Sequence, residues 1–182
     1  MNTRISGGRE RGRRIRTRDK EGLRPTSERV RSALFSIISQ SITGARVLDL
    51  YAGTGILGFE ALSRGADSVH FVESSAPRCA EIRSSLLDFK LEDRAVVTRG
   101  RVEQVAKSLK GEYDIVIADP PYDSDPWQVV MEQLDDRGVI SKLGIIVAEH
   151  SRHLTLSDQC GNLVRWEERR YGDTVLTLYK AA

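Results

Sequence analysis

The sequence predicts an α/β domain in which helices cover both faces of a mostly parallel sheet. From Gly44 onward, short apolar runs alternate with amphipathic stretches of helical length, which is the pattern of parallel strands joined by crossover helices. The first apolar run leads directly into a glycine-rich turn. The tail has two strand-like runs joined by Tyr171-Gly172-Asp173, which predicts a closing antiparallel hairpin.

The individual elements follow from these patterns in chain order. A helix is expected to begin near Thr26 or Ser27, because Pro25 precedes it and apolar residues then recur at helical spacing. Buried strands are expected at residues 46–51, 68–73, 95–98, 114–118 and 144–148. Helices are expected near residues 56–64, 76–89, 102–109 and 126–136, and hairpin strands at 163–170 and 174–180.

Composition limits the class of protein. A chain of 182 residues, 40% hydrophobic and 30% charged, fits one globular domain. No apolar run reaches the ~20 residues that span a bilayer, and no secretory signal is visible, so we expect a cytoplasmic protein that is not bound to a membrane. Cys79 and Cys160 lack CxxC partners, which predicts free thiols and neither a metal site nor a disulfide.

Positive charge is concentrated at the N-terminus. The first 31 residues contain 11 Lys or Arg and 4 Asp or Glu, whereas the remainder contains 17 and 22. We therefore predict a basic arm at residues 1–22, either mobile or folded as a short irregular hairpin, on a main domain at residues 23–182. Arginine forks suit phosphate, so the arm favours a polyanionic partner, although a tail that only improves solubility is the alternative. The candidate RNA-binding residues are Arg4, Arg9, Arg11, Arg13, Arg14 and Arg24.

A nucleotide-type ligand is predicted at the glycine-rich turn. Gly53, Gly55 and Gly58 match G-x-G-x-x-G between the first strand and its helix, so the backbone can approach a ligand closely and the helix N-terminus offers free N–H groups. Glu73 lies 20 residues after Gly53 at the end of the next strand, where an acid can bind ribose hydroxyls. This arrangement suits either NAD or S-adenosylmethionine.

Asp49 distinguishes these two ligands. It lies within the first strand, four residues before Gly53. A carboxylate there would repel a pyrophosphate but would attract the ammonium and sulfonium groups of S-adenosylmethionine. The methyl donor is therefore favoured, and an NAD-dependent oxidoreductase is the alternative that has to account for Asp49.

The candidate catalytic segment is Asp119-Pro120-Pro121-Tyr122, which follows the strand at 114–118. Its position at the carboxyl end of a strand predicts that it faces the same edge as the glycine turn. The Asp119 carboxylate can accept one N–H of an exocyclic base amine, and the Pro120 carbonyl, fixed by proline geometry, can accept the other. The Tyr122 ring can stack on the base for roughly 1–3 kcal/mol. The alternative is a proline turn in which Asp119 only initiates the turn.

These segments carry a family resemblance. Residues 47–55, Glu73 and residues 119–122 resemble the class I Rossmann-like amino methyltransferases. More narrowly, Arg4-Ile5-Ser6-Gly7-Gly8, Gly12-Arg13-Arg14-Ile15 and the segments 24–35 and 171–174 resemble the RsmD family. This is a bacterial family whose members methylate N2 of a guanine in 16S ribosomal RNA. The resemblance covers nearly the whole chain.

The resemblance implies a seven-stranded sheet, S-adenosylmethionine as donor, and 16S rRNA or a small-subunit assembly particle as partner of a monomeric enzyme. By position, Asp49, Gly53 and Gly55 would contact the methionine portion of the donor, Glu73 its ribose, and Asp119 and Tyr122 the guanine. The further candidates for donor contact are Tyr51, Val102 and Asp119. Many relatives have an acid or amide after the third strand, where this chain has Arg101, so adenine recognition is expected to fall to backbone groups and to Val102.

Other functions share parts of this pattern. An adenine-N6 methyltransferase could use the same tetrapeptide, but 182 residues leave no room for a DNA-recognition domain. A protein glutamine methyltransferase would more often have Asn at position 119. A non-catalytic RNA-binding assembly factor would not need an intact Asp119 and Tyr122. The histidines His70, His150 and His153 are expected to be structural; Glu149 and His150 are the candidates nearest the ligand edge.

Overall fold

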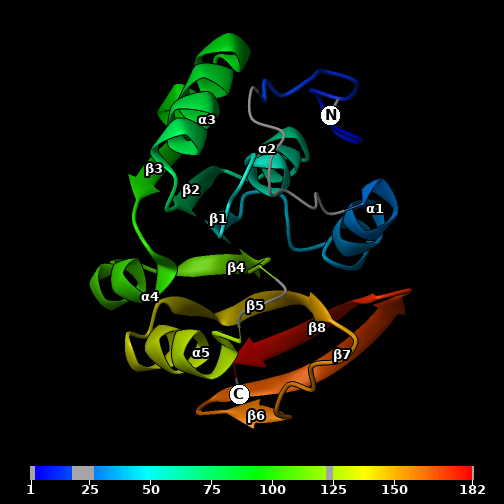
Figure 1. Cartoon of the computed structure of the whole chain (residues 1–182), viewed down its shortest axis with the longest axis vertical. Coiled ribbons are helices and arrows are strands. Elements are labelled where there is room, and N and C mark those ends of the chain that lie inside the picture. Colours follow the sequence, from blue (N-terminus) through cyan, green and yellow to red (C-terminus); the bar gives the residue numbers. More distant parts are fainter. Residues whose placement is uncertain (1–2, 18–26, 122–124, 182) are drawn as a thin grey trace.

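A computed structural model describes residues 3–17, 27–121 and 125–181 of the chain. They form one eight-stranded sheet in the order β3-β2-β1-β4-β5-β8-β7-β6 (Figure 1). The strands are β1 (Arg46–Leu50), β2 (Ser68–Glu73), β3 (Ala95–Arg99), β4 (Tyr113–Ala118), β5 (Ile140–Ser151), β6 (Gln159–Cys160), β7 (Leu163–Tyr171) and β8 (Thr174–Ala181). Strands β1 to β5 pair in parallel and the last three pair antiparallel, which confirms the predicted fold class.

The helices are α1 (Glu28–Ile37), α2 (Ile56–Ser63), α3 (Ala76–Phe89), α4 (Val102–Val105) and α5 (Trp127–Asp136), with 3-10 turns η1 (Glu92–Arg94) and η2 (Ala106–Ser108). They divide between the two faces of the sheet. Apolar residues of α1, α2 and α3 share one core cluster with Val47, Ile115 and Ile117 of β1 and β4. The alternate strand residues Leu48 and Val116 belong to a second cluster with α4 and α5. Because successive strand residues face opposite sides, these clusters identify the layer that each functional side chain enters.

Three elements differ from the sequence prediction. The sheet has eight strands, so the expected number of seven was wrong. The strand not expected, β6, pairs with β7 through two residues at the edge of the sheet, and so short a segment has no periodicity to read. Strand β5 extends well beyond the predicted 144–148, because it pairs with β8 as far as Ser151. The helix expected at 102–109 is divided into α4 and η2.

Helix α1 begins close to the predicted position. Ser27 is its N-cap, and the Ser27 hydroxyl accepts a hydrogen bond from the Val30 N–H at 3.2 Å, which satisfies a backbone donor of the first turn. Thr26 lies outside the described residues. The apolar face of α1, including Val30, Leu34 and Phe35, packs into the first core cluster.

The described part of the N-terminal segment, residues 3–17, folds as an irregular hairpin beside α2 and α3 (Figure 1). The Ile5 N–H donates to the Arg13 carbonyl at 3.0 Å, and the Ile15 N–H donates to the Thr3 carbonyl at 3.0 Å. Ile5 and Ile15 are 1% and 4% exposed and belong to the first core cluster. Of the two alternatives for the basic segment, the described residues form the hairpin.

Cys79 and Cys160 are free thiols, as the sequence predicts. Within residues 3–17, 27–121 and 125–181, no helix has both the length and the apolar character to cross a membrane. The same residues contain no group of three or more His, Cys, Asp or Glu side chains arranged to hold a metal ion.

Candidate active site

The candidate site lies where the strand order of the sheet reverses. The chain runs outward from β1 through β2 to β3 and then returns to place β4 on the other side of β1. Ligands of open α/β sheets bind beyond the carboxyl ends of the strands at such a switch point. The glycine turn follows β1 and the Asp119-Pro120 segment follows β4, so the two predicted motifs lie on either side of this point.

Asp49 is buried on the α2 side of the sheet. It alternates with Leu48 and Leu50 of the opposite layer, is 1% exposed, and accepts a hydrogen bond from the Gly58 N–H at 2.9 Å. Burial raises the pKa of Asp49 well above the usual range of a carboxyl group, and the negative charges of Asp119 and Glu73 raise it further. Two further acids at this edge of the sheet therefore act on Asp49.

Glu73 holds the glycine turn against the end of β2. Its Oε2 atom accepts a hydrogen bond from the Gly53 N–H at 2.8 Å, and its Oε1 atom accepts one from the Ser75 N–H at 2.7 Å. Gly53 and Gly55 have φ angles of 55° and 78°, which glycine adopts without the steric cost that a Cβ imposes. The turn and Glu73 are therefore built as one unit at the N-terminus of α2.

Tyr51 and Val102 lie toward the α4 side of this edge. Tyr51 has a φ angle of 58°, and its hydroxyl donates to Glu103 Oε1 at 3.0 Å. Burial and the Glu103 carboxylate raise the pKa of Tyr51. Val102 is 2% exposed and packs with Leu50 and Val72 in the second core cluster. The sequence did not single out Glu103, whose contact ties the end of β1 to α4.

Asp119 and Pro120 directly follow β4. Asp119 is half-buried and Pro120 is buried. Leu50 of β1 is in register with Ala118 of β4, so Asp119 follows at the end of β1 where the glycine turn begins, and its negative charge raises the pKa of Asp49. Tyr122, the third predicted catalytic residue, lies outside the described residues. The structure thus brings Asp119 to the same edge as Asp49, Glu73 and the glycine turn.

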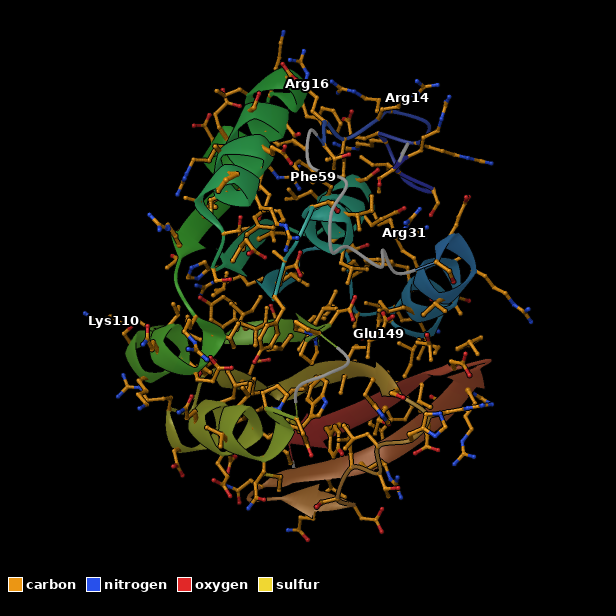
Figure 2. The ribbon with its side chains drawn as sticks, in the orientation of Figure 1. Arg14, Arg16, Arg31, Phe59, Lys110 and Glu149 are labelled. Carbon is orange, nitrogen blue, oxygen red and sulfur yellow. The ribbon has the colours of Figure 1, made fainter. Side chains whose placement is uncertain are left out.

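The next strand in the sheet, β5, contributes Glu149 and His150, whose side chains lie on opposite sides of the strand. Ala148 is in register with Ala118 of β4, so Glu149, labelled in Figure 2, follows at the level of Asp119. The Glu149 side chain is 3% exposed. His150 lies on the opposite side of the strand, with Trp127 of α5 at 6.4 Å between ring centroids. Its ring nitrogens contact the Ser151 carbonyl at 3.0 Å and the Thr177 hydroxyl at 2.8 Å. Both ring nitrogens are therefore engaged within the sheet, as expected of a structural histidine, and burial lowers the pKa of His150.

The candidate RNA-binding arginines fall into groups. Arg9, Arg11 and Arg14 are exposed and have no acidic partner among the described residues. The Arg4 guanidinium is close to the Gly12 carbonyl at 3.4 Å. Arg13 instead pairs with Glu10 at 2.5 Å and stacks over the Phe89 ring at 3.8 Å, so it attaches the hairpin to α3. Arg24 lies outside the described residues.

These residues suit a ligand that carries positive charge. Asp49, Glu73 and Asp119 gather negative charge in a largely buried place, where burial raises the pKa of Asp49 and the charges of Asp119 and Glu73 add to that effect. A ligand with an ammonium and a sulfonium group would relieve that repulsion, whereas a pyrophosphate would increase it. S-adenosylmethionine therefore fits the chemistry of these residues.

Sequence reasoning missed a buried charged cluster behind the glycine turn. Glu60 of α2 is fully buried, and its carboxylate pairs with Arg31 and Arg64, both at 3.0 Å. The only signal in the sequence is a lone acid within the apolar stretch from Ile56 to Leu62.

The strand order and the acids around the glycine turn define a class I methyltransferase, and solved structures share the fold. A structure titled "Putative methyltransferase yhhF from Escherichia coli" matches with a TM-score of 0.90 at 28% identity, covering 100% of this chain and 98% of that one. Residues 3–180 match the family model described as "Conserved hypothetical protein 95". The chain belongs to this family, the RsmD family of methyltransferases.

Two curated relatives cover almost the whole chain. "Ribosomal RNA small subunit methyltransferase D" of Escherichia coli strain K12 is 32% identical over 178 residues, covering 97% of this chain and 89% of that protein. "Putative rRNA methyltransferase YlbH" of Bacillus subtilis strain 168 is 33% identical over 181 residues, covering 97% and 98% respectively. The similarity therefore includes the N-terminal hairpin as well as the sheet.

Proposed function

We propose that this protein transfers a methyl group from S-adenosylmethionine to the exocyclic N2 amine of a guanine in 16S ribosomal RNA. The observation that carries the proposal is the joint placement of Asp49, Glu73 and Asp119 at the switch point of a methyltransferase sheet. The names of the relatives support rRNA as the substrate class. The guanine N2 atom rests on the resemblance of the whole chain to the RsmD family.

The donor would be held by the residues around the glycine turn. Asp49 and the turn at Gly53 and Gly55 would bind its methionine portion, Glu73 its ribose, and Tyr51 and Val102 would border the adenine. When bound, this cofactor supplies an electrophilic methyl group on sulfur. The fixed carboxylates orient the donor and match its positive charge, so the protein contributes electrostatic preorganisation at the reacting centre.

The acceptor would be held by the segment after β4. A base amine is a weak nucleophile because its lone pair is delocalised into the ring. The Asp119 carboxylate accepts one amine hydrogen and the Pro120 carbonyl accepts the other, which turns the lone pair toward the methyl group. Tyr122 would stack on the base, which must leave its helix or lie in a loop to reach the site.

RNA would be bound by the exposed arginines of the basic arm, assigned here to residues 1–22 next to a main domain at 23–182. Phosphate contacts position RNA without selecting a base, so base choice falls to the segment after β4. We further propose that the enzyme acts in the cytoplasm as a monomer and without a metal ion. An adenine-N6 methyltransferase and a non-catalytic RNA-binding assembly factor are the competing functions.

Labelled S-adenosylmethionine, offered with unmethylated small ribosomal subunits and separately with their naked RNA, tests the proposal. After digestion to nucleosides, label in N2-methylguanosine is the expected result, and the two substrates show whether assembly is required. Label in N6-methyladenosine would reject the guanine assignment. Donor binding without any label would favour the non-catalytic assembly factor.

A further inference from the structure

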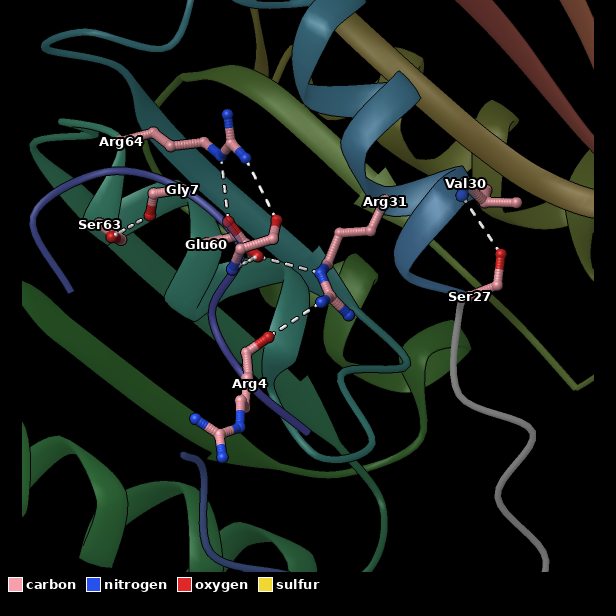
Figure 3. Close-up of polar contacts among 9 residues, drawn as sticks. Arg4, Gly7, Ser27, Val30, Arg31, Glu60, Ser63 and Arg64 are labelled. Carbon is pink, nitrogen blue, oxygen red and sulfur yellow. Dashed lines mark hydrogen bonds and ion pairs between the residues drawn. The ribbon is translucent and has the colours of Figure 1, made fainter. Parts of the chain in front are cut away.

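A buried carboxylate joins the basic hairpin to the body of the enzyme. Glu60 Oε1 accepts hydrogen bonds from the Ser6 N–H at 2.5 Å and from Arg31 Nε at 3.0 Å, while Oε2 accepts one from Arg64 Nε at 3.0 Å (Figure 3). The Arg31 side chain is 5% exposed, and its second nitrogen donates to the Arg4 carbonyl at 2.9 Å. One acid therefore connects the hairpin, α1 and α2.

The last turn of α2 holds the hairpin at further points. The Ser63 hydroxyl donates to the Gly7 carbonyl and accepts from the Glu10 N–H at 2.9 Å. The Ser63 carbonyl accepts from the Arg9 N–H at 2.8 Å. The backbones are so close at Gly8 that a Cβ there would lie 1.9 Å from the Ser63 carbonyl oxygen. The hairpin is thus packed directly onto α2.

The arginines of the hairpin divide into those that hold it and those that remain available. Arg13 and Arg16 are bound to α3, since Arg13 donates to the Asp88 carbonyl at 2.8 Å and Arg16 pairs with the Asp88 carboxylate at 2.8 Å. Arg9, Arg11 and Arg14 are exposed without acidic partners among the described residues. Figure 2 shows Arg14 at the outer surface of the hairpin.

Helix α2 also forms part of the candidate donor site. Gly55 of the glycine turn is its N-cap, and its Gly58 N–H donates a hydrogen bond to Asp49. One helix of eight residues therefore carries the donor turn at its first residues and the hairpin at Glu60 and Ser63. The backbone of the hairpin and the glycine turn are consequently both held by the same helix.

We propose that residues 3–17 are a preformed platform for RNA phosphates, presenting Arg9, Arg11 and Arg14, and that Glu60 is the positioning residue that holds it. The proposal rests on the proposed function, because it takes RNA as the substrate. Platform arginines held in place lose less conformational entropy on binding than those of a loose tail. A loose tail with the same arginines would attract RNA but would not place the target base at Asp119.

The variant Glu60→Gln distinguishes the preformed platform from a loose tail, because the two models predict opposite changes in RNA affinity. It removes one negative charge and keeps every arginine, so a tail that acts only through charge predicts equal or tighter RNA binding. The platform model predicts binding to unmethylated small-subunit RNA that is weaker by roughly tenfold, or about 1.4 kcal/mol. Donor affinity, measured in parallel, is expected to stay close to that of the unaltered protein because Glu60 lies outside the donor site.

A glycine pair provides a test without any change of charge. Gly8 and Gly12 both have positive φ angles, 77° and 85°, but a Cβ at Gly12 has no atom within 4 Å. Gly8→Ala is therefore expected to displace the hairpin and weaken RNA binding, whereas Gly12→Ala keeps it docked. If Glu60→Gln fails to fold, because Arg31 remains buried without its partner, this pair decides the question.

Hydrogen exchange of the unaltered protein provides a measurement that needs no variant. The Ser6, Arg9 and Glu10 amides, bonded to α2, should exchange slowly in the absence of RNA. Exchange at the rate of an open loop, or RNA binding by Glu60→Gln and Gly8→Ala as tight as by Gly12→Ala, would overturn the platform. These readouts are binding and exchange, so they stand apart from the nucleoside assay, whose failure would reject the methylation chemistry.

Discussion

Neutralising the three available arginines should reduce the salt dependence of RNA binding by a calculable amount. Arg9, Arg11 and Arg14 have no acidic partner among the described residues, so each can take one phosphate. Each contact to single-stranded nucleic acid contributes ~0.7 to the slope of log affinity against log salt, so the Arg→Gln triple variant should lose about 2. Between 50 and 200 mM salt the unaltered protein should therefore lose roughly 16-fold more affinity than the variant.

Fluorescence anisotropy with labelled small-subunit RNA at several salt concentrations measures both slopes. The matched control replaces Lys107, Lys110 and Lys142 by Gln; all three are exposed, and Lys110 lies near α4, away from the hairpin (Figure 2). Both triple variants lose three positive charges, but only the arginine variant should lose slope. Equal slopes for the two variants would show that overall charge, and not the hairpin, binds RNA. Deleting the hairpin is a poorer test because it would remove Ile5 and Ile15 from the core.

Three further predictions concern the candidate active site. Asp119→Ala should lower kcat by about 10²–10³-fold, as expected when one transition-state hydrogen bond is lost. Asp119→Asn shows how much of the loss in kcat is due to the negative charge. Unchanged turnover by the Ala variant would mean that Asp119 is structural. Glu73→Gln should weaken donor binding by ~1–3 kcal/mol and loosen the Gly53 turn, because an amide offers only one accepting oxygen, and calorimetry measures the affinity. Asp49→Asn should weaken donor binding yet stabilise the donor-free protein at neutral pH. Because the folded pKa of Asp49 is raised, the folded chain binds a proton that the unfolded chain releases, so stability falls as pH rises from about 4 through the folded pKa. The gain in stability of Asp49→Asn over the unaltered protein should therefore shrink as the pH falls towards 4. Thermal unfolding midpoints that differ by the same amount between the two proteins at every pH would contradict this.

The sequence was sufficient for the strands and the acids because both depend on local pattern. Each inner strand is a short apolar run, and parallel strands place their carboxyl ends at one edge. Asp49, Glu73 and Asp119 could therefore be assigned to one site without knowing any distance. The ends of β5 could not be read, because they depend on pairing with other strands: Ile140 pairs with Tyr113 of β4, and residues up to Ser151 pair with β8.

Glu60 could not be assigned from the sequence, because its partners come from remote segments. Ser6 is 54 residues away and Arg31 is 29 residues away. In the sequence, Glu60 is one acid in an apolar helix, and its hairpin partners look like part of a solvated tail. The position of a buried charge depends on tertiary neighbours, which no local periodicity records.

The docking of the hairpin also constrains the order of folding during synthesis. Its hydrogen bonds to α2 and α3 reach residues 53 to 75 positions further along the chain, so the first residues to be translated cannot dock on these helices until both have emerged. At roughly 5–20 residues per second, the delay before Glu60 is translated is about 3–11 s. During that interval the nascent chain carries an undocked, arginine-rich segment beside the RNA of the ribosome that makes it. Docking onto α2 and α3 makes this segment an ordered part of the enzyme.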